Sequence, residues 1–314
     1  MVQTQHFTTS DGAVLGYRIH APLSSSSSSS SAVPLVLING LSAVMEHWSP
    51  LVESLAESRK VLIFDHRGIG ASTVPDDWDH DLTIESMGLD LVALLASIGW
   101  TKVDLLGFSM GGHITQALIS IEEGKKTSGG GVEVRGVEIR KAVLTATMTK
   151  LPHGDADLQA IQNAAAKIKG KQERDLYITT EMMRLQYHAD ALRPGTELYK
   201  KFEDRIQVSL GTRQPAEIIA SQFFAIQGCD VRKQLHRIPS TLPVLVIHGH
   251  RDRMVSYSES DYIVKGIPHA RRFVPPQGSE FAHFWYDYFD TRTWSRAITS
   301  FLDDDNDAAS RARL

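Results

Sequence analysis

Residues 103–112, Val-Asp-Leu-Leu-Gly-Phe-Ser-Met-Gly-Gly, decide the fold of this chain. A short apolar strand runs into Gly107-Phe-Ser109-Met-Gly111, and residues 112–121 after it favour a helix. A G-x-S-x-G nucleophile motif requires this strand–turn–helix setting, because the sharp turn presents its serine at the end of a sheet strand. The glycines leave room where the strand and the helix approach closely. We therefore predict that Ser109 is a nucleophile.

The composition indicates a folded globular chain and argues against several classes of partner and site. The 314 residues are 42% hydrophobic, which is enough for one large α/β domain or two small ones. The net charge of -4 is spread over both signs without a basic stripe, so no nucleic-acid partner is expected. The single cysteine, Cys229, excludes internal disulfides and cysteine-based metal sites. No apolar run reaches about 18 residues and the first residues lack signal-peptide features, so we expect a soluble intracellular protein.

Strand patterns alternate with helical patterns along the chain. The predicted strands occupy residues 5–9, 13–20, 34–39, 61–65, 103–108, 142–147, 243–247 and 271–274. The predicted helices follow Ser42 and occupy residues 84–98, 112–121, 258–266 and 284–302. Residues 122–136, rich in glycine and charge, indicate a surface excursion. This alternation predicts an α/β fold with a mostly parallel, doubly wound sheet.

The pattern changes between residues 148 and 236, where apolar residues recur at helical spacing without a strand-like run. We predict about four helices there, forming a helical cap (148–236) inserted into a core of residues 1–147 and 237–303. Residues 24–31 are all serine and predict a flexible loop, since serine buries no apolar surface against roughly 1–2 kcal/mol per residue of ordering cost. A flexible tail is expected at 304–314.

Ser109 needs a base to take its proton, and that base needs a group that orients it. Asp252 follows the predicted strand 243–247, and His283 precedes the last predicted helix. The order of the three residues along the chain, serine then acid then histidine, is the order that accompanies a G-x-S-x-G nucleophile motif. Both side chains are expected at the carboxyl edge of the sheet, where ligands bind in open α/β folds.

Each assignment has a structural alternative. Ser109 could stabilise a tight turn, Asp252 could be a surface turn residue, and His283 could be a packed histidine. Asp261 is the alternative acid, and His269 is the alternative base.

The remaining histidines favour structural roles. His66 and Arg67 are expected to brace the glycine turn that follows them, and His113 is expected to pack in its helix. His248 and His250 flank the acid and resemble metal ligands. Without a nearby cysteine or a His-x-x-x-His helix, the sequence does not favour a zinc site.

A set of apolar side chains in the predicted cap could either line a pocket or form a helix core. Its members are Met182, Met183, Leu185, Tyr187, Phe223 and Phe224.

Three stretches, residues 37–41, 65–72 and 107–112, resemble the α/β-hydrolase superfamily. They look like the branch that contains enol-lactonases, cofactor-free haloperoxidase-like esterases and carbon–carbon bond hydrolases. The resemblance covers nearly the whole chain outside 148–236.

This resemblance implies Ser109 as nucleophile, His283 as general base and then acid, and Asp252 as the orienting carboxylate. It also implies an oxyanion hole formed by the backbone N–H groups of Leu41 and Met110. One such donor is typically worth about 10²–10³ in rate.

Two positions depart from the family pattern. Asn39-Gly40 stands where the family usually has His-Gly, but the amide of Leu41 does not depend on that side chain. Ala282-His283 replaces the usual Gly-His, which keeps the base and allows a different loop backbone.

The sequence therefore predicts a serine hydrolase that acts on an ester, lactone or thioester of a small, moderately apolar molecule, with acyl-CoA-linked and secondary-metabolite substrates as candidates. A carbon–carbon bond hydrolase with the same triad and a non-catalytic ligand receptor on the same fold are the alternatives. No metal, nucleotide or flavin cofactor is expected, because the chain has no phosphate-cradling glycine loop.

The sequence ends in Ala312-Arg313-Leu314, which resembles the small–basic–leucine variant of the Ser-Lys-Leu peroxisomal address. It predicts a peroxisomal import receptor as a partner and a peroxisomal location, with the cytoplasm as the alternative.

Overall fold

The computed structural model describes residues 2–22, 32–152, 154 and 158–304. Within these residues one 10-stranded sheet runs in the order β1-β2-β4-β3-β5-β8-β7-β6, and β9 pairs with both β8 and β10. The strands are β1 (Gln5–Thr8), β2 (Val14–His20), β3 (Leu35–Ile38), β4 (Val61–Phe64), β5 (Lys102–Phe108), β6 (Lys125–Lys126), β7 (Val132–Val134), β8 (Val137–Thr145), β9 (Val244–Ile247) and β10 (Arg271–Arg272).

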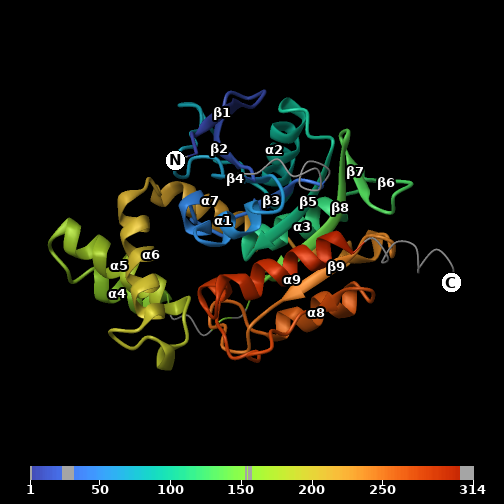
Figure 1. The fold of residues 1–314 in the computed structure, drawn as a ribbon. Helices are drawn as coiled ribbons and strands as arrows, with labels where there is room; N and C mark the ends of the chain where they lie inside the picture. Colours follow the sequence, from blue (N-terminus) through green and yellow to red (C-terminus); the bar gives the residue numbers. More distant parts are fainter. Residues whose placement is uncertain (1, 23–31, 153, 155–157, 305–314) are drawn as a thin grey trace.

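Parallel pairing joins the six central strands, which lie across the sheet in the order β4, β3, β5, β8, β9 and β10. Strands β1 and β2 form an antiparallel hairpin, and β2 pairs antiparallel with β4. Helices cover both faces of this sheet (Figure 1). The prediction of a mostly parallel, doubly wound α/β fold is confirmed.

The α-helices connect and cover these strands. They are α1 (Leu51–Ala56), α2 (Ile84–Ser97), α3 (Met110–Ile119), α4 (Leu158–Ala165), α5 (Lys171–Leu185), α6 (Glu197–Gly211), α7 (Ala216–Gln227), α8 (Ser258–Gly266) and α9 (Thr291–Asp303). Short 3₁₀ helices are η1 (Met45–Trp48), η2 (Ala189–Ala191), η3 (Val231–Lys233), η4 (Leu235–Arg237) and η5 (Trp285–Asp287).

The buried strands feed two hydrophobic layers, because successive side chains point to opposite faces. Val36 and Ile38 of β3 pack in the layer that contains α2, α3 and α8. Leu35 and Leu37 of the same strand pack in the layer that contains α1 and α9. A continuous apolar run therefore marks a strand that is covered on both sides.

Two local predictions were wrong, and one predicted loop contains strands. The surface excursion at 122–136 contains β7, which pairs antiparallel with β8, and β6, which pairs antiparallel with β7; these strands are too short to show a periodic pattern. The helix expected after Ser42 is split into η1 and α1. The helix expected at 284–302 is split into η5 and α9, because Asp290 accepts a hydrogen bond from the amide of Arg292 and caps α9 there.

Helices α4 to α7 lie between β8 and β9 in the chain, and we call them the inserted helices. In Figure 1, α4, α5 and α6 lie together at one end of the molecule, beyond the sheet. The domain boundaries drawn from the sequence stay a prediction. The poly-serine stretch 24–31 and the C-terminal Ala312–Leu314 lie outside the described residues, so the predicted address also stays a prediction.

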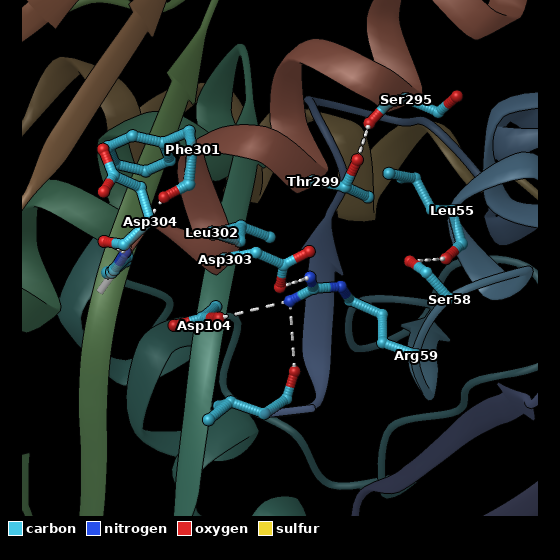
Figure 2. Close-up of polar contacts among 12 residues, drawn as sticks. Leu55, Ser58, Arg59, Asp104, Ser295, Thr299, Phe301, Leu302, Asp303 and Asp304 are labelled. Carbon is cyan, nitrogen blue, oxygen red and sulfur yellow. Dashed lines mark hydrogen bonds and ion pairs between the residues drawn. The ribbon is translucent and has the colours of Figure 1, made fainter. Parts of the chain in front are cut away.

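Ion pairs and hydrogen bonds around the buried Arg59 and Asp104 join the last helix, α9, to the sheet (Figure 2). The guanidinium of Arg59 is 2.5 Å from Asp303 at the end of α9 and 3.6 Å from Asp104 of β5. Arg140 also pairs with Asp104 and donates to the carbonyl of Leu302 at 2.7 Å. Cations placed at a helix C-terminus satisfy its free carbonyls and match its dipole. Within the described chain, no helix is apolar and long enough to cross a bilayer.

Candidate active site

Ser109 lies at the tight turn between β5 and α3, as predicted. Its backbone has φ 55° and ψ -120°, a strained conformation for a residue with a side chain. Two hydrogen bonds to residues at and just after the end of β8 maintain this strained conformation. The amide of Ser109 donates to the carbonyl of Thr145 at 3.0 Å, and the hydroxyl of Thr147 donates to the carbonyl of Ser109 at 2.6 Å.

The glycines of the motif are required by close backbone approach. A Cβ added at Gly111 would lie 2.0 Å from the carbonyl oxygen of Ile38, and one added at Gly107 would lie 2.3 Å from the carbonyl oxygen of Gly111. The start of α3 therefore presses against the end of β3. Met110 is the first residue of α3, so its N–H has no acceptor within the helix.

The loop after β3 lies directly beside the serine. A Cβ added at Gly40 would lie 3.0 Å from the Cβ of Ser109, which places Leu41 next to the turn. The following residue, Ser42, has φ 59° and donates its amide to the side-chain oxygen of Gln222 in α7 at 2.8 Å. An inserted helix thus supports the backbone that carries the amide of Leu41.

Asp252 and His283 are brought together from loops 31 residues apart. Nδ1 of His283 is 2.7 Å from Oδ2 of Asp252, and both residues are buried. Oδ1 of Asp252 accepts the amides of Met254 and Val255, each at 2.9 Å. The carboxylate is therefore fixed by its own loop and faces the histidine.

Burial alone would raise the pKa of the Asp252 carboxyl, but the charges and hydrogen bonds of His283 and His248 outweigh it. The pKa is held well below its usual range. Asp252 is thus ionised at neutral pH, as an orienting carboxylate must be.

The histidine also contacts the nucleophile turn. The rings of His283 and Phe108, the residue before Ser109, lie 4.9 Å apart between centroids. Backbone bonds from His250 to Ser279 and from Arg251 to Phe281 join the acid loop to the histidine loop, at 2.8 and 3.1 Å. The structure therefore gathers the Ser109 turn, His283 and Asp252 at one edge of the sheet.

The alternative acid and base lie elsewhere. Asp261 is exposed and pairs with Arg272, and the ring of His269 hydrogen-bonds the carbonyl of Leu242 at 3.0 Å. Neither contact involves His283.

His66 and Arg67, which were expected to support the glycine turn that follows them, are also buried. Burial lowers the pKa of His66 to about 4, and its Nε2 lies 3.1 Å from the carbonyl of Asn39, just before the loop beside Ser109. Arg67 pairs instead with Asp11 at 2.6 Å and with Asp90 at 2.5 Å.

The apolar side chains singled out in the predicted cap, between Met182 and Phe224, include both buried and exposed members. Met183, Leu185 and Tyr187 are buried, whereas Phe224 is 64% exposed. The core interpretation therefore fits the first three, and Phe224 belongs to neither a core nor an enclosed pocket.

Two polar groups near the site were not assigned from the sequence. Nε2 of His248 lies 3.2 Å from Oδ2 of Asp252; the sequence places His248 four residues before Asp252, but that spacing did not favour a zinc site and indicated no other role. Arg205 of α6 forms a buried ion pair with Asp287 of η5 at 2.6 Å. No sequence signal joins those two residues.

Arg205 ties three segments together. Besides Asp287, it donates to the carbonyls of His47 in η1 and of Ser49, the latter at 3.0 Å. The hydroxyl of Tyr187 donates to the same carboxylate at 2.5 Å. One buried polar cluster thus joins the inserted helices to η1 and to the segment after His283.

Comparison with known proteins agrees with this architecture. The sequence model of the alpha/beta hydrolase fold matches residues 33–287, so the chain belongs to that family and is an enzyme of the α/β-hydrolase type.

Several relatives resemble most of its length. A Pseudomonas savastanoi pv. phaseolicola protein named as a carbamate hydrolase, RutD, is 23% identical over 85% of this chain and 93% of its own. The 3-oxoadipate enol-lactonase 2 of Acinetobacter baylyi is 24% identical over 75% and 78%. The solved enol-lactonase of Burkholderia xenovorans superposes with a TM-score of 0.72 at 21% identity, covering 96% of this chain and 100% of the other.

Proposed function

We propose that this hydrolase cleaves an ester, lactone or thioester of a small, moderately apolar molecule through Ser109, His283 and Asp252. The observation that carries the proposal is the buried contact of 2.7 Å between His283 and Asp252, made beside a serine held at φ 55° in a strand-to-helix turn. An ionised carboxylate that accepts from Nδ1 leaves Nε2 of His283 as the proton acceptor.

In the first half of the reaction, Ser109 attacks the substrate carbonyl carbon and His283 accepts the hydroxyl proton. The amides of Leu41 and Met110 bind the oxyanion that forms. His283 then gives the proton to the leaving alcohol or thiol as the tetrahedral intermediate collapses.

In the second half, His283 takes a proton from water, whose oxygen attacks the acyl-enzyme. Collapse of this second intermediate releases the acid, and the proton returns to Ser109. Asp252 keeps the imidazole in the required tautomer and stabilises its charged form throughout.

The inserted helices are proposed to act as a cap over this site. Gln222 supports the loop of Leu41, and Arg205 joins α6 to the segment after His283. Apolar residues of a cap would bind the acyl or alcohol part of the substrate and exclude water. The names of the relatives make lactones and carbamates the first substrates to test on this chain.

Turnover of p-nitrophenyl acetate and butyrate by the wild type and by Ser109→Ala tests the proposal. We expect ester hydrolysis by the wild type and a loss of at least about 10³-fold in the variant. Equal turnover by the two proteins would contradict it. The same comparison with an enol-lactone and a carbamate then narrows the substrate class.

A further inference from the structure

A second histidine contacts the carboxylate of Asp252. Nε2 of His248 is 3.0 Å from the carbonyl oxygen of Val255 and 3.2 Å from Oδ2 of Asp252. A carbonyl oxygen can only accept, so Nε2 of His248 carries a hydrogen. That hydrogen faces both oxygens, and the imidazole is in its Nε2–H tautomer.

Both oxygens of Asp252 are therefore fully occupied. Oδ1 accepts the amides of Met254 and Val255, Oδ2 accepts from Nδ1 of His283, and Nε2 of His248 lies 3.2 Å from Oδ2. Two histidine nitrogens thus lie within 3.2 Å of Oδ2: Nε2 of His248, from the loop of Asp252 itself, and Nδ1 of His283, from the later loop. The electron density that Oδ2 offers to His283 thus depends on the donor at His248.

We propose that His248 is a positioning residue that fixes Asp252 and limits the basicity of His283. The proposal rests on the triad chemistry proposed above and adds a residue to it. A donor on Oδ2 draws charge from that oxygen and weakens its attraction for the imidazolium form of His283. Without this donor, Oδ2 keeps more of its charge and holds the imidazolium form of His283 more strongly.

The surroundings of His248 are buried and hold few other charges. Its ring lies 5.8 Å from that of Tyr257 and lines a small cavity of about 10 Å³, together with Arg272 of β10. Arg272 is paired with Asp261 of α8. Among the residues that the structure describes, the titratable and charged groups that face His248 and Asp252 are His283, Tyr257, Arg272 and Tyr288. None of these is altered by the substitutions below.

His248→Phe keeps an aromatic ring edge-to-face with Tyr257 and removes the donor. His248→Gln restores an N–H donor at nearly the same reach. His250→Phe is the matched control, because His250 is an exposed histidine of the same loop that pairs with Glu280 at 3.7 Å.

The measurement is kcat/KM for p-nitrophenyl butyrate between about pH 5 and pH 9. Activity requires neutral His283, so it rises with pH to a plateau. For His248→Phe we expect the midpoint of this rise to move up by about half a unit to one unit, with kcat lower by about tenfold and KM little changed. His248→Gln should lie close to the wild type, and His250→Phe should show neither effect.

An unmoved midpoint in His248→Phe, or the same movement in His250→Phe, would overturn the proposal. A second measurement needs no variant: histidine-selective ¹⁵N NMR of the wild type should show His248 as the neutral Nε2–H tautomer. An Nδ1–H tautomer would contradict the assignment. Absence of ester turnover by the wild type would count against the proposed function, and the NMR result would still decide the role of His248.

Discussion

The guanidinium of Arg205 meets the carboxylate of Asp287 at 2.6 Å across the boundary between α6 and the segment that follows His283. Both side chains are almost completely buried. Removing one partner of such a pair leaves an uncompensated buried charge. We therefore expect Arg205→Met to lower the free energy of unfolding by about 3–5 kcal/mol in urea titrations.

The control for this variant is Arg184→Met. Arg184 belongs to the neighbouring helix α5 and pairs with Glu181 at the surface, at 3.3 Å. A surface pair of this kind contributes little, so the change should stay within about 0.5 kcal/mol. Similar values for the two variants would contradict the locking role of Arg205.

Gly40→Ala tests the loop beside the nucleophile. Its new Cβ would lie 3.0 Å from the Cβ of Ser109, which is too close unless the loop shifts. A shift of this backbone moves the amide of Leu41, and we expect kcat/KM to fall by about tenfold or more. Gly211→Ala is the control, because no atom lies within 4 Å of the Cβ added there. Equal losses in the two variants would show that the loop position is not critical.

Buried histidines predict acid destabilisation. Burial lowers the pKa of His47 to about 3 and those of His66 and His113 to about 4. Between these values and 6.5, the unfolded state binds more protons than the folded state. The stability that these neutral rings contribute is complete above pH 6.5 and is lost as the pH falls through that window.

Asp65 acts in the opposite sense. Burial raises the pKa of its carboxyl from 3.8 to about 7, so its contribution is complete below 3.8 and is lost as the pH rises through 7. Burial also lowers the pKa of His20 and raises the pKa values of Asp90 and Asp104, so four histidines oppose three aspartates among the described residues. The net free energy of unfolding should decrease from pH 6.5 to about pH 4. Urea midpoints measured across this range check the sign, and a midpoint that rises on acidification would contradict it.

His113→Met should reduce this loss. The ring of His113 is fully buried, and neither ring nitrogen has a hydrogen-bond partner among the described residues. An apolar side chain removes that desolvation cost and one of the groups that titrate. The variant should be more stable than the wild type at pH 5, with a smaller gap at pH 7.5, in thermal unfolding at both values. Equal or lower stability at pH 5 would be inconsistent with this reason.

Local chemistry explains what the sequence could predict. The apolar runs around Val36 and Val246 marked buried strands, and Gly107–Gly111 marked the turn because only glycine fits there. The strand and turn signals depend on neighbouring residues alone. Asp252 and His283 were predicted from their order along the chain after Ser109 and from their places near the ends of predicted elements, and the structure places the two side chains in contact.

The remaining features depend on contacts between distant residues. Arg205 and Asp287 are 82 positions apart, and the sequence contains no pattern that pairs them. His248 stands four positions before Asp252, but its proposed role rests on a contact of 3.2 Å that forms only in the folded loop. The strand at Val132–Val134 is too short for alternation to separate it from a loop.

The central claim is that Ser109 is the nucleophile activated by His283. Incubation with a fluorophosphonate, followed by intact-mass analysis and peptide mapping, tests it most directly. We expect one adduct on Ser109 of the wild type, none on Ser109→Ala, and labelling slowed by at least about 10²-fold in His283→Ala. An adduct on another residue, or undiminished labelling of His283→Ala, would contradict the account.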